Sequence, residues 1–156
     1  MSPSFHHRNL PHLLLHARET LMAHFRPLLN EAGVTEQQWR VLRTLSETGP
    51  MEPNQIARSC QLLSPSLTRM LAGMQEQGLI KRERSRADQR RQEISLTPKS
   101  HKLIDRMRPM VDAKYLELES RIGKELLDRM YRDVDAMVEL IKRDPDAPQE
   151  PGETQS

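Results

Sequence analysis

The sequence contains few residues of two kinds, cysteine and aromatic residues, and it has no long apolar run. A single cysteine, Cys60, excludes an internal disulfide and fits a reducing cytoplasm. Aromatic residues form 3% of the 156 residues, so we expect an aliphatic core. No stretch approaches the roughly 20 apolar residues of a membrane span, and the N-terminus lacks the apolar segment of a secretory signal. These absences indicate a cytoplasmic protein, and the length of 156 residues with its apolar content predicts one domain with a modest core.

Motifs of catalysis and of metal binding are also missing. We find no nucleophile elbow, phosphate-binding loop or convincing carboxylate pair, so we do not expect an enzyme. His12 and His16 have a spacing that suits zinc, but no third and fourth ligands follow at matching spacing, and we expect no metal or other cofactor. Cys60 follows Ile56 and Ala57 at core spacing, which favours a buried small residue over a redox switch.

Residues 53–97 contain a short helix, a turn, a second helix and a basic hairpin. The second helix has both ends marked: Ser64 suits the N-cap, Pro65 the first helical position and Gly78 the C-terminal stop. Its apolar residues recur at helical spacing and form one inward stripe: Leu67, Met70, Leu71 and Met74. This order of elements predicts a winged helix-turn-helix, which places its second helix in the DNA major groove.

The opposite face of that helix and the hairpin loop are the predicted DNA contacts. Arg69 can be bidentate to guanine, and the hydroxyls of Ser66 and Thr68 can reach bases or phosphates. Residues 81–91 hold six basic and two acidic residues, a net charge of +4, while the whole chain carries only +2. Such a concentration is typical of phosphate neutralisation, although a charge run can also be a solvated surface. The predicted contact residues are Ser64, Ser66, Thr68, Arg69, Arg82, Arg84, Arg86, Asp88, Gln89, Arg90 and Arg91.

These motifs resemble the MarR family of bacterial winged-helix regulators in order and spacing, over roughly residues 10–142. The matching residues are 56–57, 67–69, 77–82, 88–90 and 96–97. The resemblance implies that Arg90 enters the minor groove and that Asp88 helps to orient it. Ser100 stands where the family usually has glycine. The expected fold is mainly α with a small β-wing: two helices, a short strand, two helices, two strands around the wing, and two helices.

A narrower resemblance, to the homoprotocatechuate-degradation repressor branch, rests on residues 17–19, 25–27, 35–40 and 65–68. It implies a bacterial, nucleoid-associated repressor of an aromatic-acid catabolic operon of the hydroxyphenylacetate, homoprotocatechuate or hydroxynicotinate type. The operator would be a pseudo-palindromic DNA duplex, and a small aromatic carboxylate would release the protein from it. The alternatives are a metal- or oxidant-sensing regulator on the same fold and a DNA binder without sequence preference.

Outside the DNA-binding domain, expected at residues 35–97, both ends of the chain carry helical apolar stripes. Residues 10–34 and 98–143 have more apolar surface than a small winged helix needs, which predicts an intertwined homodimer. The alternative is a monomeric helical cap. Residues 1–9 are expected to form an N-terminal arm, and residues 144–156 a disordered acidic tail.

An aromatic acid needs a cation for its carboxylate and an apolar wall for its ring. We expect Arg18 to supply the cation, His12 and His16 the polar contacts, and Trp39 the wall. In some relatives that bind hydroxybenzoates, an arginine of the first helix serves the acid, and this resemblance favours Arg18. The alternatives are that Arg18 pairs with Glu19 or Glu36 and that Trp39 belongs to the core.

Overall fold

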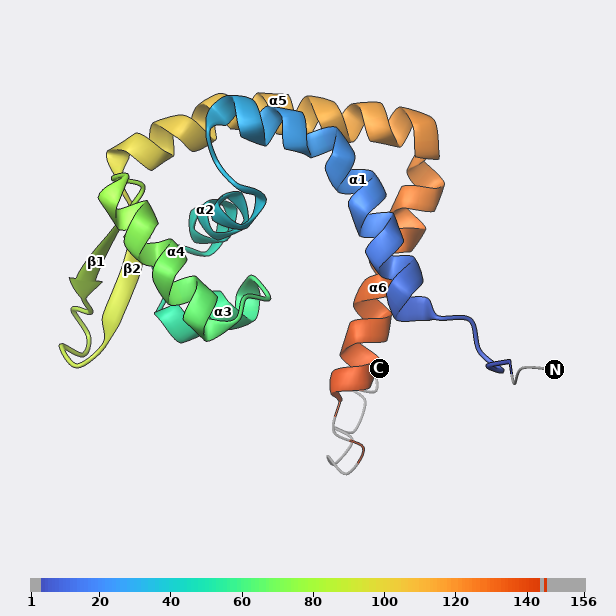
Figure 1. Ribbon diagram of the computed structural model, residues 1–156, viewed down its shortest axis with the longest axis horizontal. Helices are drawn as coiled ribbons and strands as arrows, with labels where there is room; N and C mark the ends of the chain where they lie inside the picture. Colours follow the sequence, from blue (N-terminus) through green and yellow to red (C-terminus); the bar gives the residue numbers. More distant parts are fainter. Residues whose placement is uncertain (1–3, 144, 146–156) are drawn as a thin grey trace, which may run out of the picture. The chain divides into compact units, whose positions relative to one another are not determined.

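The computed structural model describes residues 4–143 and residue 145 (Figure 1). It forms two compact units, Met1–Lys114 and Tyr115–Ser156. The expected disordered tail, residues 144–156, lies outside the described residues except for Pro145. Within the described part, no helix is long and apolar enough to cross a membrane.

The order of elements agrees with the predicted winged helix-turn-helix. The helices and strands are α1 (Leu10–Ala32), α2 (Glu36–Thr48), α3 (Pro53–Ser59), α4 (Ser64–Glu76), β1 (Ile80–Arg84), β2 (Gln92–Leu96), α5 (Pro98–Ile122) and α6 (Lys124–Lys142). The two strands are antiparallel, in a register that runs from Ile80 opposite Leu96 to Arg84 opposite Gln92. Figure 1 shows this hairpin beside α4, with its loop directed away from the helices.

The short strand expected before α3 is reduced to one bridge, in which Met51 pairs with Ile94. Both backbone hydrogen bonds of the bridge form, at 3.1 Å from the Met51 amide and 2.7 Å from the Ile94 amide. Pro50 and Pro53 flank it and have no amide hydrogen to extend the ladder, and Pro53 already begins α3.

Capping residues fix where the helices begin. The capping box of α2 is confirmed, because Thr35 and Gln38 exchange side-chain to backbone hydrogen bonds of 3.0 and 3.1 Å. The prediction that Ser64 is the N-cap of α4 was wrong. The Leu63 carbonyl accepts the first helical hydrogen bond, from the Leu67 amide at 2.9 Å, so Leu63 is the N-cap and Ser64 is already helical.

The core of the first unit lies where α2, α3 and α4 pack on one face of the hairpin. The predicted inward stripe of α4 is confirmed, with Leu67, Leu71 and Met74 buried and Met70 half-buried. Cys60 is completely buried in the same core, as its spacing indicated. The other core residues with no exposed surface are Val41, Leu42, Ile56 and Ile94. This packing holds α4 with its opposite face in solvent.

The second unit contains the last turns of α5 and all of α6. Gly123, with φ of +88°, separates the two helices at the predicted break. None of the side chains of α6 is buried, although the helix carries an apolar stripe at helical spacing. Its exposed apolar residues are Leu126, Met130, Tyr131, Val138, Leu140 and Ile141. A water-exposed stripe of this extent is typical of a surface that is covered by another element or chain.

Candidate nucleic-acid interface

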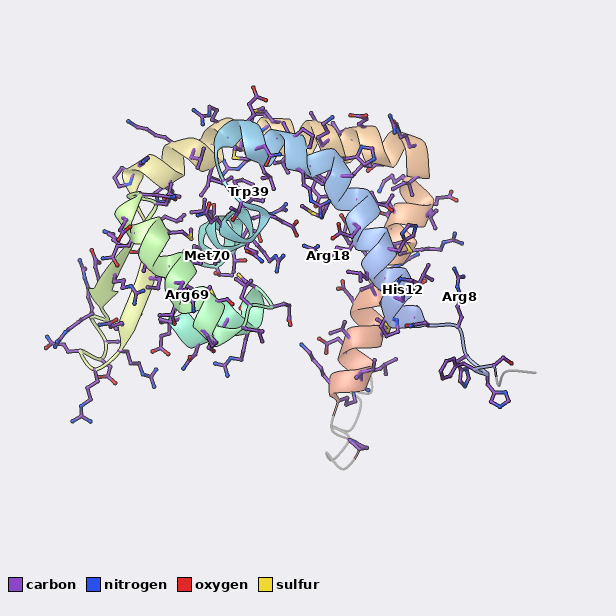
Figure 2. All side chains as sticks on the ribbon, in the orientation of Figure 1. Arg8, His12, Arg18, Trp39, Arg69 and Met70 are labelled. Atoms are coloured by element: carbon purple, nitrogen blue, oxygen red, sulfur yellow. The ribbon has the colours of Figure 1, made fainter. Side chains whose placement is uncertain are left out.

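The outward face of α4 presents short polar side chains and one arginine. Ser64, Ser66, Thr68 and Arg69 are all exposed. The Thr68 hydroxyl donates to the Ser64 carbonyl at 3.0 Å, so its oxygen remains free to accept. Arg69, labelled on α4 in Figure 2, has no hydrogen-bond or ionic partner among the described residues. The face therefore offers a free guanidinium beside residues that are small enough for close approach to DNA.

The loop between β1 and β2, residues 85–91, is the tip of the wing, and its own side chains order it. The Asp88 carboxylate accepts from the Arg90 amide at 3.0 Å, and the Asp88 carbonyl accepts from the Arg91 amide at 3.0 Å. The Ser85 amide donates to the Arg91 carbonyl at 2.8 Å and closes the loop, while the Ser85 hydroxyl accepts from Ala87 at 3.2 Å. Asp88 thus fixes the backbone that carries Arg90.

The wing arginines differ in how free they are. Arg84, Arg86 and Arg90 are exposed and form no ion pair in the part of the chain that is described. Arg91 pairs with Glu52 at the start of α3, at 3.4 Å, and so ties the wing to the helix-turn-helix. The positive charge available to a phosphate backbone is therefore concentrated at and near the wing tip.

Arg82 has a different environment from the other predicted contact residues. In the register of the hairpin it lies opposite Ile94, on the face that carries Ile80 and packs on the helices. Its side chain is half-buried, and its Nε is buried without a hydrogen-bond partner. The period of two in a strand places Arg82 inward, which counting charges along the loop could not show.

Arg18 lies in a group of charged residues that joins α1 to α2, here called the Glu36 cluster: Arg18, Glu19, Arg26, Glu36 and Arg40. Arg18 forms ion pairs with both Glu19 and Glu36, as the alternative interpretation of this residue expected. Arg26 binds Glu19 at 2.6 Å and Glu36 at 3.5 Å. The hydrogen bond from Arg26 lowers the pKa of the Glu19 carboxyl below its usual value.

Arg40 extends the Glu36 cluster to the helix-turn-helix. One of its nitrogens is 3.3 Å from Glu36, and the other donates to the Cys60 carbonyl at 2.7 Å. Cys60 is the C-cap of α3 and precedes the turn into α4. A chain of contacts therefore runs from α1, through Glu36, to the turn before the recognition helix. The sequence predicts Glu19 and Glu36 as partners of Arg18, but nothing in it indicates that Arg26 and Arg40 join them.

The other residues expected to bind an effector are not gathered around Arg18 within one chain. His12 and His16 are exposed. His16 lies on roughly the opposite side of α1 from Arg18, because a separation of two residues turns the helix by about 200°. Trp39 is half-buried and packs against the core, one turn after Glu36 on α2 (Figure 2). Among the described residues, no group of three or more histidine, cysteine, aspartate or glutamate side chains is arranged to hold a metal ion.

A helix-turn-helix with an uncovered polar face, followed by a hairpin with free arginines, defines a winged helix-turn-helix DNA-binding protein. Comparison with known proteins gives the family. Residues 34–91 match the MarR family model. The chain is 39% identical to the HTH-type transcriptional regulator FarR of Neisseria gonorrhoeae over 129 residues, 83% of this chain and 86% of the relative. The chain belongs to the MarR family and is a transcriptional repressor, not an enzyme.

The chain is also similar to a second curated relative and to a solved structure. The chain is 34% identical to the homoprotocatechuate degradative operon repressor of Escherichia coli over 86% of this chain and 90% of the relative. The structure of NadR in complex with 4-hydroxyphenylacetate superposes with a TM-score of 0.78, at 36% identity, over 92% of this chain and all of NadR. The transcriptional repressor CouR, whose structure was solved bound to a 23-mer DNA duplex, has the same fold, with a TM-score of 0.66 at 24% identity over 86% of this chain and 93% of CouR.

Proposed function

We propose that this repressor controls an aromatic-acid catabolic operon and leaves its operator when a small aromatic carboxylate binds. The observation that carries the proposal is the 36% identity to NadR, whose structure contains 4-hydroxyphenylacetate. The name of the Escherichia coli relative, a homoprotocatechuate degradative operon repressor, supports the same class of pathway. The hydroxyphenylacetate and homoprotocatechuate type is therefore the first choice, with hydroxynicotinate as the second.

In this proposal Arg18 anchors the effector by exchanging one carboxylate for another. Arg18 is bound to Glu36 in the free protein, so an entering acid takes the place of Glu36 instead of meeting an unpaired cation. Glu36 keeps Arg26 and Arg40 as partners, which limits the electrostatic cost of the exchange. Trp39, one turn further along α2, provides the wall for the ring. His12 and His16 belong to the proposed site only if they come from the partner subunit.

Release of DNA requires that the acid bind the free conformation better than the DNA-bound one. The contact of Arg40 with the Cys60 carbonyl gives Glu36 a physical connection to the turn before α4. A change in the partners of Glu36 therefore biases the position of α4. The coupling expected for such a switch is about 1–3 kcal/mol, or roughly 5- to 150-fold in operator affinity.

The proposed complex is a cytoplasmic, nucleoid-associated dimer on a pseudo-palindromic operator. Each α4 enters a major groove, and each wing tip enters the neighbouring minor groove. The proposed dimer interface lies within residues 10–34 and 98–143, and the exposed apolar stripe of α6 supports it. Residues 35–97 form the DNA-binding domain between them. The half-sites would lie about 10 base pairs apart, one turn of the duplex.

The test is a titration of labelled operator complex with 4-hydroxyphenylacetate, homoprotocatechuate and 6-hydroxynicotinate. At least one acid should release the wild-type protein, whereas Arg18→Ala should still bind operator and respond weakly or not at all. Arg108→Ala is the matched control, because Arg108 is exposed and pairs only with Asp105 among the described residues. Release of Arg18→Ala at the wild-type ligand concentration would exclude Arg18 as the anchor.

The same purified protein and operator complex can also distinguish the alternative functions. If none of the three acids acts, zinc analysis of the purified protein and peroxide treatment of the operator complex test the metal and oxidant alternatives. Cys60 is buried, which makes a direct thiol sensor the weaker of the two. Equal affinity for operator and random duplex would instead indicate a DNA binder without sequence preference.

A further inference from the structure

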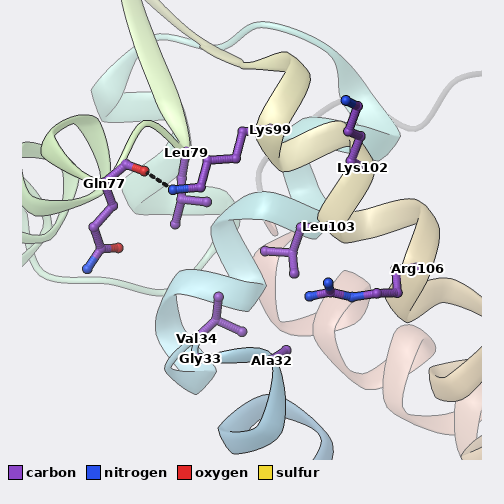
Figure 3. A pocket seen from close by; sticks show the side chains of 9 residues that line it. All are labelled: Ala32, Gly33, Val34, Gln77, Leu79, Lys99, Lys102, Leu103 and Arg106. Carbon is purple, nitrogen blue, oxygen red and sulfur yellow. Dashed lines mark hydrogen bonds between the residues drawn. The ribbon is translucent and has the colours of Figure 1, made fainter.

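A hollow of about 590 Å³ lies in the first unit, and none of the five residues of the Glu36 cluster lines it (Figure 3). It is bordered by the C-terminal end of α1, the junction of α4 with β1, and the first turns of α5. This volume falls in the usual range for sites that bind small molecules. Arg18 is 14 residues before Ala32, which begins this border, so the hollow and Arg18 are about 20 Å apart along α1.

The floor of the hollow is apolar. Val34 and Leu79 line it and are each 5% exposed, and Leu103 of α5 also lines it and packs against the core. Figure 3 shows these three side chains converging from three different segments of the chain. An apolar group placed on them would remove hydrocarbon surface from water, and this favours binding by about 25 cal/mol per Å².

The rim is cationic. Lys99, Lys102 and Arg106 lie at positions i, i+3 and i+7 of α5, and no aspartate or glutamate among the described residues lines the hollow. Lys99 donates to the Gln77 carbonyl at 2.6 Å, which holds it at the end of α4. Lys102 and Arg106 form no ion pair in the described part of the chain. In Figure 3 the Arg106 guanidinium extends from α5 toward Ala32 and Val34, near Leu103.

We propose that this hollow is a second ligand site, which binds an organic carboxylate with an apolar body. The body lies on Val34, Leu79 and Leu103, and the carboxylate meets the Arg106 guanidinium, with Lys102 adding to the positive potential. Arginine suits this role because its planar fork can donate two parallel hydrogen bonds to a carboxylate. An inorganic anion would leave the floor uncovered, and an uncharged apolar molecule would leave the arginine without a partner.

The proposal can be tested on the full-length protein by following its backbone amides in NMR spectra. The probe is 4-phenylbutyrate, compared with 4-phenylbutanol, which has the same body without charge, and with inorganic phosphate, which has charge without the body. Titration should shift the amide signals of Gly33, Leu79 and Lys99, which belong to the three bordering segments. The measurement is made on Arg18→Ala as well as wild type, so that binding near Arg18 is separated from binding in the hollow.

Arg106→Gln should weaken phenylbutyrate binding by about tenfold, since the charge-assisted hydrogen bonds are lost. Arg108→Gln is the matched control on the same helix and should bind as wild type does. Phenylbutanol should bind more weakly than phenylbutyrate by a similar factor. The proposal is overturned if phosphate causes the same shifts at the same concentration, if the alcohol binds as well as the acid, or if the acid leaves these three amides unchanged. Loss of the shifts in Arg18→Ala would equally reject a separate site.

Discussion

Asp88 and Arg90 show how one carboxylate can assist a protein that binds a polyanion. Asp88 lies in the most basic segment of the chain and should repel phosphates, yet its side chain accepts the Arg90 amide and its carbonyl accepts the Arg91 amide. It therefore fixes the turn from which Arg90 projects. Whether the repulsion or the ordering dominates can be measured directly, because asparagine keeps the acceptor and removes the charge.

We expect Asp88→Ala to weaken operator binding by roughly fivefold, the effect of about one lost hydrogen bond in the turn. Asp88→Asn should bind at least as tightly as wild type, and Arg90→Ala should lose at least about tenfold in affinity. All three should melt near the wild-type temperature, because the wing tip is exposed. Fluorescence anisotropy with labelled operator measures the affinities. Tighter binding by Asp88→Ala would mean that repulsion outweighs ordering.

We assign to Arg69 the recognition of a base pair in the operator. Arg69→Ala should reduce discrimination at particular operator positions by about 1–3 kcal/mol each, with little change at other positions. The measurement is a set of competition titrations in which each operator base pair is substituted in turn. A uniform loss across all positions would show that Arg69 contacts a phosphate and not a base.

At the scale of elements, the sequence predicted best where local chemistry decides the structure. The capping box at Thr35, the break at Gly123 and the inward stripe of α4 follow from spacing and side-chain type, and all three are confirmed. The preference for serine at N-caps predicts Ser64 at that position, but the hydrogen bond to the Leu63 carbonyl starts the helix one residue earlier. The short strand expected before α3 is reduced to one bridge because Pro50 and Pro53 flank Met51.

The sequence predicts the candidate site less well than the elements, because charged residues that are far apart in the chain meet only after folding. Arg40 is 20 residues from Cys60, and no local pattern predicts their hydrogen bond. The same holds for the hollow next to α5. Its basic residues have helical spacing that was visible in the sequence, but the apolar floor comes from three separate segments.

The hydrogen bond from Arg40 to the Cys60 carbonyl should stabilise the packing of α2 on α3. Arg40→Met should lower the free energy of unfolding by about 1–3 kcal/mol, because the carbonyl of the buried Cys60 loses a charged donor. Arg121→Met is the control, since the pair of Arg121 with Glu117 is exposed and should contribute less than about 1 kcal/mol. Urea denaturation followed by circular dichroism measures both. Equal effects of the two substitutions would contradict a special role for Arg40.

At the scale of the whole molecule, the modest net charge of +2 conceals a segment of +4 at residues 81–91. The rest of the chain is therefore slightly acidic, which directs the positive wing toward DNA and reduces attraction elsewhere. Only the arrangement of charge, and not its total, supports DNA binding.

If the dimer neutralises roughly 6–10 phosphates, the logarithm of operator affinity should fall with the logarithm of salt concentration with a slope of about −5 to −9. Affinities measured between 50 and 300 mM salt (about a sixfold range of ionic strength) give this slope. Arg90→Ala should make it shallower by about one per neutralised phosphate lost. A nearly flat response would contradict the assignment of the wing to the phosphate backbone.

The complete burial of Cys60 has a practical consequence for watching this protein move. The chain has no other thiol, so a thiol-reactive dye can label it only at this position and only when the packing of α2 against α3 opens. The rate of labelling then reports the frequency of that opening, without any engineered probe. Operator DNA, by holding the recognition helix and its supports in place, should slow the labelling, and a releasing ligand should restore its speed. The labelling rate of Cys60 would therefore measure how often the packing of α2 against α3 opens, and how the proposed ligand changes it.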